Sequence, residues 1–532
     1  MRQWLLLYVL MVSLSVSAQP EPDVIRYRFE ISLNDKNDSI RGKARILFTI
    51  TQADSLLAFD LTGPLPISKK GMKVTNAALS SGSNMIPVTI TQESQRVLLH
   101  LRKSISSKDT LNLLLSYEGI PNDGLIISKN KFGQRTFFAD NWPNRGHNWI
   151  PCHDVPWDKA AVEFAVTAPR QYQVVANGVQ MEESTLPGNM KYTEWLEEVP
   201  VSPKVMVIGV AEFAVQLSGM VNNCMPVYSW VYPQDRDAGF YDYAQAIDIL
   251  NYYIGAIGPY AYKKLANVES KTIFGGLENA NTIFYSESAI SGTRENEELI
   301  AHEIAHQWFG NMATEKTFAH LWLSEGFATY MTVLYFENKY GVENAKDILR
   351  GDRDIVCAYA QQSNRPVVDD NPDYLKLLNP NSYQKGSWVL HMLRQETGDS
   401  IFRKGIRQYY ATYAGSTAST SDFRKVMETV SGKDLTVFFN QWLERPGVPN
   451  LKISWKWDAG KKELQVTVDQ LQDKPYVFPL EIGLSGNTSR VETMQVSNKT
   501  QTFSFPCEEK PGKLAVDPEV KLLFKSQVTE IR

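Results

Sequence analysis

The sequence predicts a multidomain α+β protein: an N-terminal β-sandwich or saddle-shaped sheet domain, a mixed domain with a mainly helical second half, and a small C-terminal β-sandwich. With 532 residues, the chain is too long for one hydrophobic core and suggests about three domains. Apolar residues alternate in the first and last parts, whereas the middle repeats them at helical spacing. We expect a signal peptide and three domains, at 1–18, 19–217, 218–445 and 446–532.

The first residues resemble a secretory signal peptide. Arg2 precedes an apolar run at 4–16, and Ala18 ends a stretch of small residues where cleavage is expected. We expect export with cleavage after Ala18, to a periplasm or out of the cell, with an uncleaved membrane anchor as the alternative. No later stretch reaches the ~20 apolar residues of a transmembrane helix, so none is expected after the signal is removed.

Charge and cysteine content restrict the partners. The chain has 55 basic and 59 acidic residues, a net charge of -4 and no basic run, which argues against nucleic acid as a partner. The four cysteines lie far apart, and their spacing selects none of the possible disulfide pairings. No Cys-x-x-Cys pair indicates a second, structural zinc site.

The N-terminal domain begins with a predicted hairpin. Apolar residues alternate at 25–33 and again at 46–50, and residues 34–38 supply a turn between them. Further short alternating runs follow at 96–101, 111–117, 162–167 and 205–213. Such a series of strands is typical of a sandwich or saddle-shaped sheet.

The pattern changes after residue 237. Helical spacing is predicted at 240–257, 293–309 and 321–340, with a short strand-like run at 271–278. The segment 446–449, Pro-Gly-Val-Pro, ends the helical pattern. Alternation returns at 451–457 and 464–468, around a turn at 459–460, and predicts the small C-terminal sandwich.

The helix predicted at 293–309 carries the motif His302-Glu303-Ile304-Ala305-His306. Residues four apart lie on one helix face, so His302 and His306 can bind one ion. Catalytic zinc sites use three protein ligands and leave the fourth position to water, and Glu325 can be the third ligand. We predict one zinc ion per chain, which indicates a hydrolase; Glu325 as an ordinary residue of a helix first turn is the alternative.

Glu303 is the predicted general base. It follows the first ligand and can reach a zinc-activated water without ligating the metal. A solvated helix carboxylate is the alternative.

The segment 275–279, Gly-Gly-Leu-Glu-Asn, interrupts a strand-like run shortly before this motif. Paired glycines in a strand let another backbone approach closely, as an extended peptide substrate requires. A bulged turn is the alternative reading of these glycines.

Four motifs together resemble those of the gluzincin zinc aminopeptidases, typified by aminopeptidase N and the leukotriene hydrolase. They are Gly-Gly-Leu-Glu-Asn at 275–279, His-Glu-Ile-Ala-His-Gln-Trp-Phe-Gly-Asn at 302–311, Leu-Trp-Leu-Ser-Glu-Gly-Phe-Ala-Thr-Tyr at 321–330 and Tyr-Gln-Lys-Gly at 383–386. The resemblance covers essentially the mature chain. It implies a saddle domain, a thermolysin-like α+β catalytic domain and a small sandwich, in that order.

The resemblance also implies a zinc metalloaminopeptidase that hydrolyses the N-terminal bond of peptides with free N-termini. Carried over residue by residue, it implies His302, His306 and Glu325 as ligands, Glu303 as base, Glu278 on the α-amino group, Gly275 and Gly276 along the peptide backbone, and Tyr383 on the oxyanion.

Three positions depart from the family pattern. Leu277 replaces the methionine common at the floor of the specificity pocket, so the preferred N-terminal residue stays open. Ser324 replaces the asparagine usual before the third ligand, a change that should leave coordination intact. Asn141 takes the place of a glutamine or glutamate that helps to hold the amine; Trp142, Asp140 or a plain loop are alternatives.

Long members of the family carry a C-terminal helical domain over the active site, and this sequence ends with the small sandwich. We therefore expect a more open cleft that admits longer peptides, or one closed by a second subunit in a homo-oligomer.

Two other functions compete with the aminopeptidase. A thermolysin-like endopeptidase shares the zinc motif, and Glu278 argues against it because an endopeptidase has no amine to bind. A catalytically inactive peptide-binding protein of the same fold is the second, and an epoxide hydrolase side activity stays open.

Overall fold

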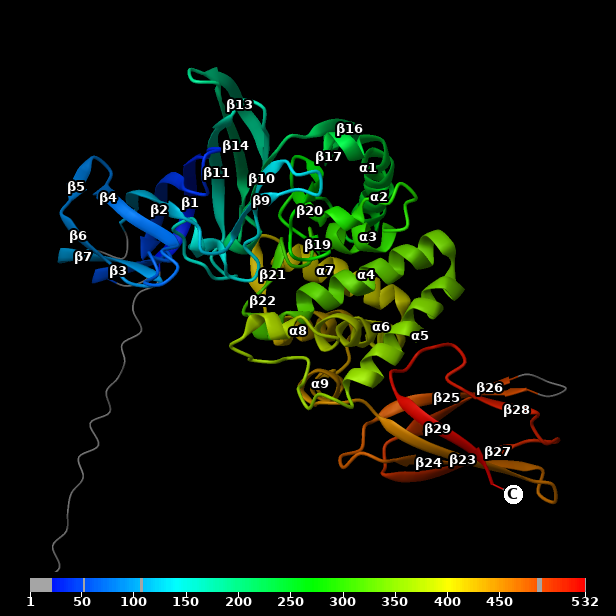
Figure 1. The fold of residues 1–532 in the computed structure, drawn as a ribbon. Coiled ribbons are helices and arrows are strands. Elements are labelled where there is room, and N and C mark those ends of the chain that lie inside the picture. Colours follow the sequence, from blue (N-terminus) through cyan, green and yellow to red (C-terminus); the bar gives the residue numbers. More distant parts are fainter. Residues whose placement is uncertain (1–21, 51–52, 106–108, 486–489, 532) are drawn as a thin grey trace, which may run out of the picture.

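The computed structural model describes residues 22–50, 53–105, 109–485 and 490–531. Figure 1 shows a sheet-rich N-terminal part, a mixed middle part and a separate C-terminal sandwich following one another along the molecule. The predicted α+β fold class is confirmed. The signal peptide predicted at 1–18 lies outside the described residues.

The N-terminal part is built on an eight-stranded sheet with the order β13-β14-β11-β1-β2-β8-β4-β5. Its strands are β1 (Pro22–Ser32), β2 (Ile40–Ile50), β4 (Gly71–Ser81), β5 (Asn84–Ile86), β8 (Leu111–Ile120), β11 (Ala160–Pro169), β13 (Val179–Leu186) and β14 (Met190–Val201). The predicted hairpin is β1 and β2, which pair antiparallel, and β1 also pairs parallel with β11. Alternate residues of β1 and β2 are buried because one face packs on the core.

Two smaller sheets complete this part. One has the order β12-β15-β10-β9 and the other β3-β7-β6. Their strands are β3 (Asp54–Asp60), β6 (Val88–Gln92), β7 (Arg96–Ile105), β9 (Leu125–Lys129), β10 (Arg135–Ala139), β12 (Gln173–Ala176) and β15 (Ile208–Ala211). The strand predicted at 205–213 is reduced to β15, because Pro203 begins a 3₁₀ turn just before it.

The middle part begins with a five-stranded sheet of order β16-β17-β18-β20-β19. Its strands are β16 (Ala214–Val221), β17 (Met225–Val231), β18 (Leu265–Ser270), β19 (Gly276–Leu277) and β20 (Thr282–Ser286). Because β16 pairs with β17, the domain boundary predicted after residue 217 falls inside a strand of this sheet. Among the described strands, the short β19 pairs only with β20 and forms one edge of the sheet.

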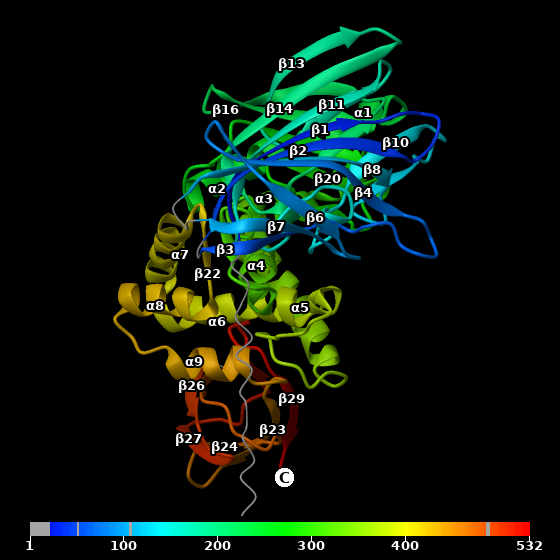
Figure 2. The same ribbon diagram turned by 90° about the vertical axis from the view of Figure 1, so that its left-hand side faces the viewer.

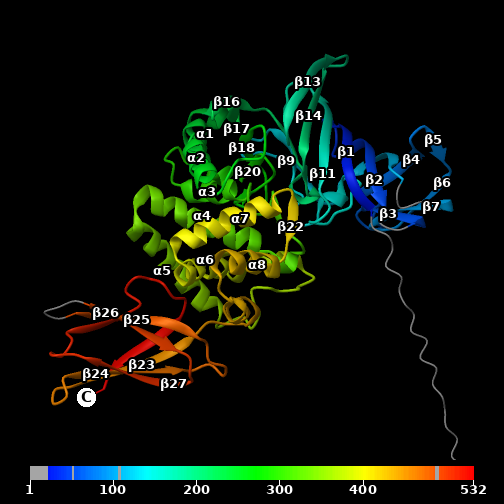
Figure 3. The same ribbon diagram turned by 180° about the vertical axis from the view of Figure 1, so that it is seen from behind.

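Helices form the rest of the middle part (Figures 1 and 3). They are α1 (Arg236–Tyr243), α2 (Ala246–Ala256), α3 (Glu297–Ala305), α4 (Trp322–Tyr340), α5 (Val342–Tyr359), α6 (Gly386–Thr397), α7 (Asp399–Tyr413), α8 (Thr420–Ser431) and α9 (Thr436–Phe439). Short strands β21 (Ala313–Glu315) and β22 (Ser416–Ala418) pair beside α7.

The helix predicted at 293–309 is shorter in the structure, where α3 begins at Glu297. The Asp242 carboxylate accepts hydrogen bonds from the backbone N–H groups of Ser291, Gly292 and Arg294, which holds the preceding segment as a loop. Asn296 makes no capping bond, because its side-chain amide donates to the carbonyl of Ala289. The loop is therefore fixed by a residue of α1 that lies far away in the sequence.

Helices α4 and α6 touch through two glycines. A Cβ atom placed on Gly326 would lie 2.8 Å from Cα of Gly386, and one on Gly386 would lie 2.9 Å from Cα of Gly326. Any side chain at either position would push the two helices apart. This contact sets the spacing between the start of α4 and the segment that precedes α6.

The C-terminal part packs two sheets, β27-β24-β23-β29 and β26-β25-β28. The strands are β23 (Asn450–Asp458), β24 (Glu463–Gln470), β25 (Phe478–Ser485), β26 (Arg490–Val496), β27 (Thr500–Pro506), β28 (Lys513–Val516) and β29 (Lys525–Glu530). Figure 2 shows this sandwich next to α9. Buried Lys385 ties it to the helices, since its ammonium donates to the carbonyl of Gly447 at 2.8 Å in the connecting segment.

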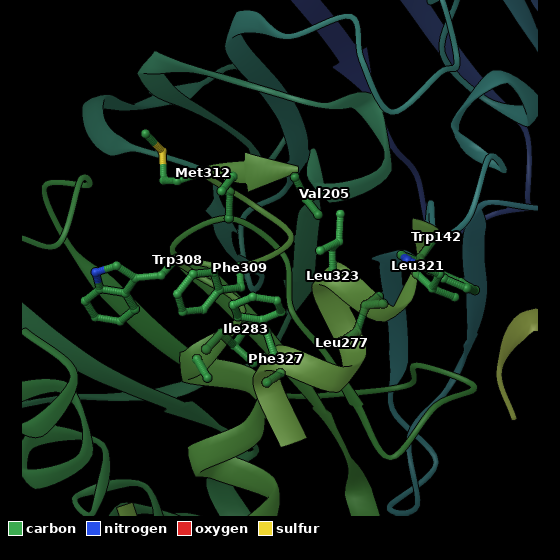
Figure 4. Packing of buried hydrophobic residues seen from close by; sticks show 14 of the residues in the cluster. Trp142, Val205, Leu277, Ile283, Trp308, Phe309, Met312, Leu321, Leu323 and Phe327 are labelled. Carbon is green, nitrogen blue, oxygen red and sulfur yellow. The ribbon is translucent and has the colours of Figure 1, made fainter. Parts of the chain in front are cut away.

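The apolar core of the middle part runs beneath the helix that carries the histidine motif. Figure 4 shows Phe309 and Phe327 side by side there, with ring centroids 4.6 Å apart. All four cysteines are free. Across the described ranges, no helix combines the length and apolar character that crossing a membrane requires.

Candidate active site

A cavity of about 530 Å³ lies against α3, α4 and the edge strand β19. It is lined by every predicted site residue except Asn141: Gly275, Gly276, Leu277, Glu278, His302, Glu303, His306, Glu325 and Tyr383. These residues come from four separate segments of the chain. The fold therefore brings together the motifs that sequence spacing alone could only place one by one.

Two histidines and one glutamate form a triangle of donor atoms. His302 Nε2 and His306 Nε2 lie 3.0 Å apart, and each lies 3.3 Å from Oε2 of Glu325. Ligands about 2.0–2.1 Å from a tetrahedral zinc ion are separated by similar distances, roughly 3.3 Å. The triangle therefore fits three ligands of one zinc ion.

Hydrogen bonding at the other ring nitrogen of His306 supports this fit. Nδ1 of His306 lies 3.1 Å from the carbonyl oxygen of Phe309 and 3.1 Å from the hydroxyl of Ser324. Because a carbonyl only accepts, Nδ1 carries a proton, and Nε2 is the ring nitrogen left to face Glu325 and His302. A bound cation could take the place of the proton on Nε2 and balance the Glu325 carboxylate beside it.

The charges of the triangle point the same way. Burial alone would lower the pKa of His306, but the Glu325 carboxylate raises it to about 10. Burial of Glu325 is likewise outweighed, chiefly by His306, and its pKa stays well below the usual value. Both shifts reflect a place where positive charge is favoured between these groups.

Two residues that sequence reasoning did not assign, together with Asp140, which it named only as an alternative at the amine site, hold the site in place. Gln307 and Asn311 donate side-chain hydrogen bonds to the carbonyl of Glu278, at 3.0 and 2.6 Å. Asp140 accepts hydrogen bonds from Thr272 and Ile273, just before the glycine pair. Both Gln307 and Asn311 belong to the extended histidine motif, which was the available signal, and Asp140 lies in the stretch that the resemblance matched to the amine site.

Glu303 is buried and faces the glycine pair across the cavity. Burial raises its pKa well above the usual value, and the nearby Glu278 and Glu325 carboxylates add to this although His306 opposes it. A Cβ atom on Gly276 would lie 2.2 Å from Oε1 of Glu303. Glycine at 276 is thus required by the position of the Glu303 carboxylate.

We expect Gly276→Ala to lower kcat by about 10²-fold, because a displacement of roughly 1 Å in a reacting group has effects of this size. The measurement is turnover of a leucyl fluorogenic amide. Gly275→Ala is the matched control, since a Cβ there meets no atom within 4 Å. Equal losses in the two variants would contradict the steric role of Gly276.

Glu278 places an unpaired carboxylate in the same cavity. Its side chain is 5% exposed, and no described residue is a hydrogen-bond partner of Oε1. A carboxylate oxygen of Glu278, a carboxylate oxygen of Glu303 and a ring nitrogen of His306 lie within 4.8 Å of one another. A buried carboxylate without a partner is costly, so the position favours a positively charged group of a ligand.

Tyr383 lies in a π-helical turn, Asn381–Lys385, that runs into α6. Its ring stacks against His302 with centroids 6.0 Å apart and an interplanar angle of 18°. Burial, followed by the nearby Glu325, raises the pKa of Tyr383 well above its usual value, so the hydroxyl keeps its proton. The sequence motif did not reveal the π-helical turn.

The assignment of Asn141 to the amine site is wrong. Its amide nitrogen donates to the carbonyls of Pro203 and Met206, and its oxygen accepts from the indole N–H of Trp149. Asn141 is fully buried and does not line the cavity. Trp142 lines it instead, with its ring edge-on to Phe274 at 5.9 Å. Asn141 therefore fastens its own loop.

Comparison with known proteins identifies related sequences. Residues 23–203 match the model of the Peptidase M1 N-terminal domain, and residues 241–442 match the model of the Peptidase family M1 domain. Aminopeptidase 2 of Candida albicans is 22% identical over 89% of this chain and 53% of its own length. Tricorn protease-interacting factor F2 of Thermoplasma volcanium is 28% identical over 75% and 50%.

Human glutamyl aminopeptidase is 25% identical over 76% of this chain and 44% of its own length. The chain thus spans about half the length of the curated relatives it matches.

Proposed function

Because the chain belongs to peptidase family M1, we propose that it is a zinc-dependent aminopeptidase that removes single residues from the N-termini of peptides. One observation carries the proposal: the unpaired carboxylate of Glu278 lies in the same cavity as the triangle of His302, His306 and Glu325. The first group suits an ammonium ion and the second suits a metal ion. A peptide substrate brings an ammonium group for the first site, and next to it the carbonyl of the scissile bond, which a metal ion at the second site can polarise.

His302, His306 and Glu325 would hold the zinc ion. When bound there, zinc would supply Lewis acidity, which polarises the scissile carbonyl and lowers the pKa of a water molecule. Ser324 and the carbonyl of Phe309 fix the ring of His306 through Nδ1, so that Nε2 stays directed at the metal position.

Glu303 is the proton carrier in this proposal. Its carboxylate accepts a proton from the attacking water at an Oε atom and delivers it to the nitrogen of the departing amine. The raised pKa of Glu303 suits the second step, because a carboxyl group that holds a proton readily can donate it near neutral pH. Its burial keeps bulk water from exchanging that proton.

Tyr383 supplies the hydroxyl that stabilises the oxyanion. Negative charge develops on the carbonyl oxygen as water attacks, and a fixed neutral donor stabilises that charge without reorganising. The hydroxyl of Tyr383 keeps its proton, as its raised pKa requires for this role.

Glu278 makes the site select the end of a chain. An ammonium group there gains a charge-assisted hydrogen bond, and an internal peptide nitrogen cannot replace it. The second side of the edge strand β19 pairs with no strand of the described ranges, so the peptide backbone can align along Gly276 and Leu277. These features favour an aminopeptidase over an endopeptidase.

We expect Glu278→Ala to lower kcat/KM for a free peptide by about 10- to 100-fold, the equivalent of a lost charge-assisted bond of ~1.5–3 kcal/mol. The measurement compares Leu-Ala-Ala-amide with its N-acetylated form, using the wild type, Glu278→Ala and the isosteric Glu278→Gln. The wild type should cleave only the free peptide. Equal cleavage of both peptides by the wild type would establish an endopeptidase and contradict the proposal.

A further inference from the structure

The cavity extends away from Glu278 along α3. Glu278 lies beside His306, at the C-terminal end of this helix. The opposite end is lined by Glu295 and Glu298, beside the first turn of α3, and by Ile348 of α5. With a rise of about 1.5 Å per residue, Glu298 lies roughly 12 Å from His306 along the helix axis. The cavity thus leaves room for a peptide whose amine binds Glu278 to extend its departing part toward Glu298.

This end of the cavity is acidic and lacks positive partners. Glu297, between the two cavity-lining glutamates, turns away and pairs with Lys339. Neither Glu295 nor Glu298 has an ion-pair partner among the described residues. The cavity lining includes five glutamates, and none of the described residues that line it is lysine or arginine.

A third acid, Asp352, is buried in α5 near Glu298, behind the cavity lining rather than part of it. Asp352 follows Ile348 by one helical turn and is 8% exposed. Within the described part of the chain, Oδ2 of Asp352 has no hydrogen-bond partner. Burial, followed by the nearby Glu298 carboxylate, raises its pKa to about 7. A buried carboxylate with an unpartnered oxygen and a second acid nearby is stabilised by an added cation.

The same end offers apolar surface as well as charge. Leu299, Val333 and Ile348 line the cavity around the acids. Lysine and arginine side chains pair a charged head with an aliphatic stem that packs on such surface. A small inorganic cation would gain nothing from these apolar side chains, whereas a basic side chain uses both features.

We propose that Glu295, Glu298 and Asp352, here called the acidic end, select a lysine or arginine as the second residue of the substrate. This inference rests on the proposed aminopeptidase function, because it places the amine at Glu278. The second residue becomes the new N-terminus after cleavage, and its side chain is the first on the departing part.

The test compares three amidated peptides, Leu-Arg-Ala-Ala, Leu-citrulline-Ala-Ala and Leu-Glu-Ala-Ala, by kcat/KM at pH 8. Citrulline has the shape of arginine without its charge. We expect arginine to exceed citrulline by about fivefold, since partly exposed charges interact modestly, and glutamate to be the poorest of the three. Raising the salt concentration from about 50 to 500 mM should reduce the arginine preference by screening.

Variants locate the effect. Glu298→Gln and Asp352→Asn should each bring the arginine-to-citrulline ratio closer to one, and the ratio cancels any general loss of activity. Asp354→Asn is the matched control, because Asp354 lies exposed on the same helix and does not line the cavity. If Asp352→Asn fails to fold, the exposed Glu298→Gln still decides the question.

The outcomes separate the two proposals. If the wild type cleaved all three peptides with an arginine-to-citrulline ratio of one, the proposed selection by the acidic end would be wrong, and the proposed aminopeptidase activity would still hold. A ratio unchanged by Glu298→Gln would also overturn it. No cleavage of any free peptide by zinc-loaded protein would overturn the proposed function, and the inference with it.

Discussion

Glu303→Gln is expected to lower kcat by about 10³-fold, within the range of ~10²–10⁴ found for a positioned acid–base group. Glutamine keeps the shape of the side chain but cannot accept the proton of the attacking water. The measurement is kcat and KM for a leucyl fluorogenic amide. We expect KM to change little, because Glu303 is not among the atoms that hold the substrate amine.

The zinc content of the purified variant is the control for this experiment. Glu303 lies outside the ligand triangle, so Glu303→Gln should retain about one zinc ion per chain, as the wild type should. Chelation should stop turnover by the wild type, and added zinc should restore it. A variant that keeps its zinc and loses less than about tenfold in kcat would exclude Glu303 as the proton carrier.

Tyr383→Phe has the second largest expected effect, a loss of about 10²–10³ in kcat, as for removal of one oxyanion donor. The phenyl ring preserves the stacking with His302 and removes only the hydroxyl. Since the donor acts on charge that develops during the reaction, KM should stay nearly constant. Steady-state kinetics with the same fluorogenic amide measure both constants.

A neighbouring tyrosine provides the comparison. Tyr374 precedes Tyr383 in the same connection and packs against Phe318 with ring centroids 4.5 Å apart and an interplanar angle of 39°, outside the cavity lining. Tyr374→Phe should retain kcat within about twofold, as expected for a substitution away from the reacting atoms. If Tyr383→Phe lowered kcat no further than Tyr374→Phe, the hydroxyl of Tyr383 would have no role in the reaction.

Much of the fold could be predicted because strand and helix periods differ. The hairpin of β1 and β2 and the long helix α4 follow directly from apolar spacing. The start of α3 could not be predicted, since the Asp242 carboxylate that holds the preceding loop belongs to α1. A hydrogen bond between residues so far apart in the sequence leaves no local pattern from which a helix start could be predicted.

The candidate site was predictable to a similar degree. Ligand types at helical spacing placed His302 and His306 together and Glu325 was expected as the third ligand, and in the structure the Glu325 carboxylate lies 3.3 Å from Nε2 of each histidine. Asn141 was assigned by its position in a matching stretch, and a buried amide that satisfies backbone carbonyls looks the same in sequence as one that faces a ligand. The acidic end was missed because Glu295 and Glu298 lie at the start of α3 and Asp352 lies in α5, segments that only the fold brings together.

The contact between Gly326 and Gly386 limits how this site can change over time. Glu325 directly precedes Gly326, and the turn that contains Tyr383 directly precedes Gly386. The contact between the two glycine backbones therefore sets the distance between the Glu325 carboxylate and the Tyr383 hydroxyl. Such a contact has no rotamers that could absorb a substitution. We therefore expect natural variation and laboratory libraries to alter cavity positions such as Thr329 freely while leaving these two glycines fixed.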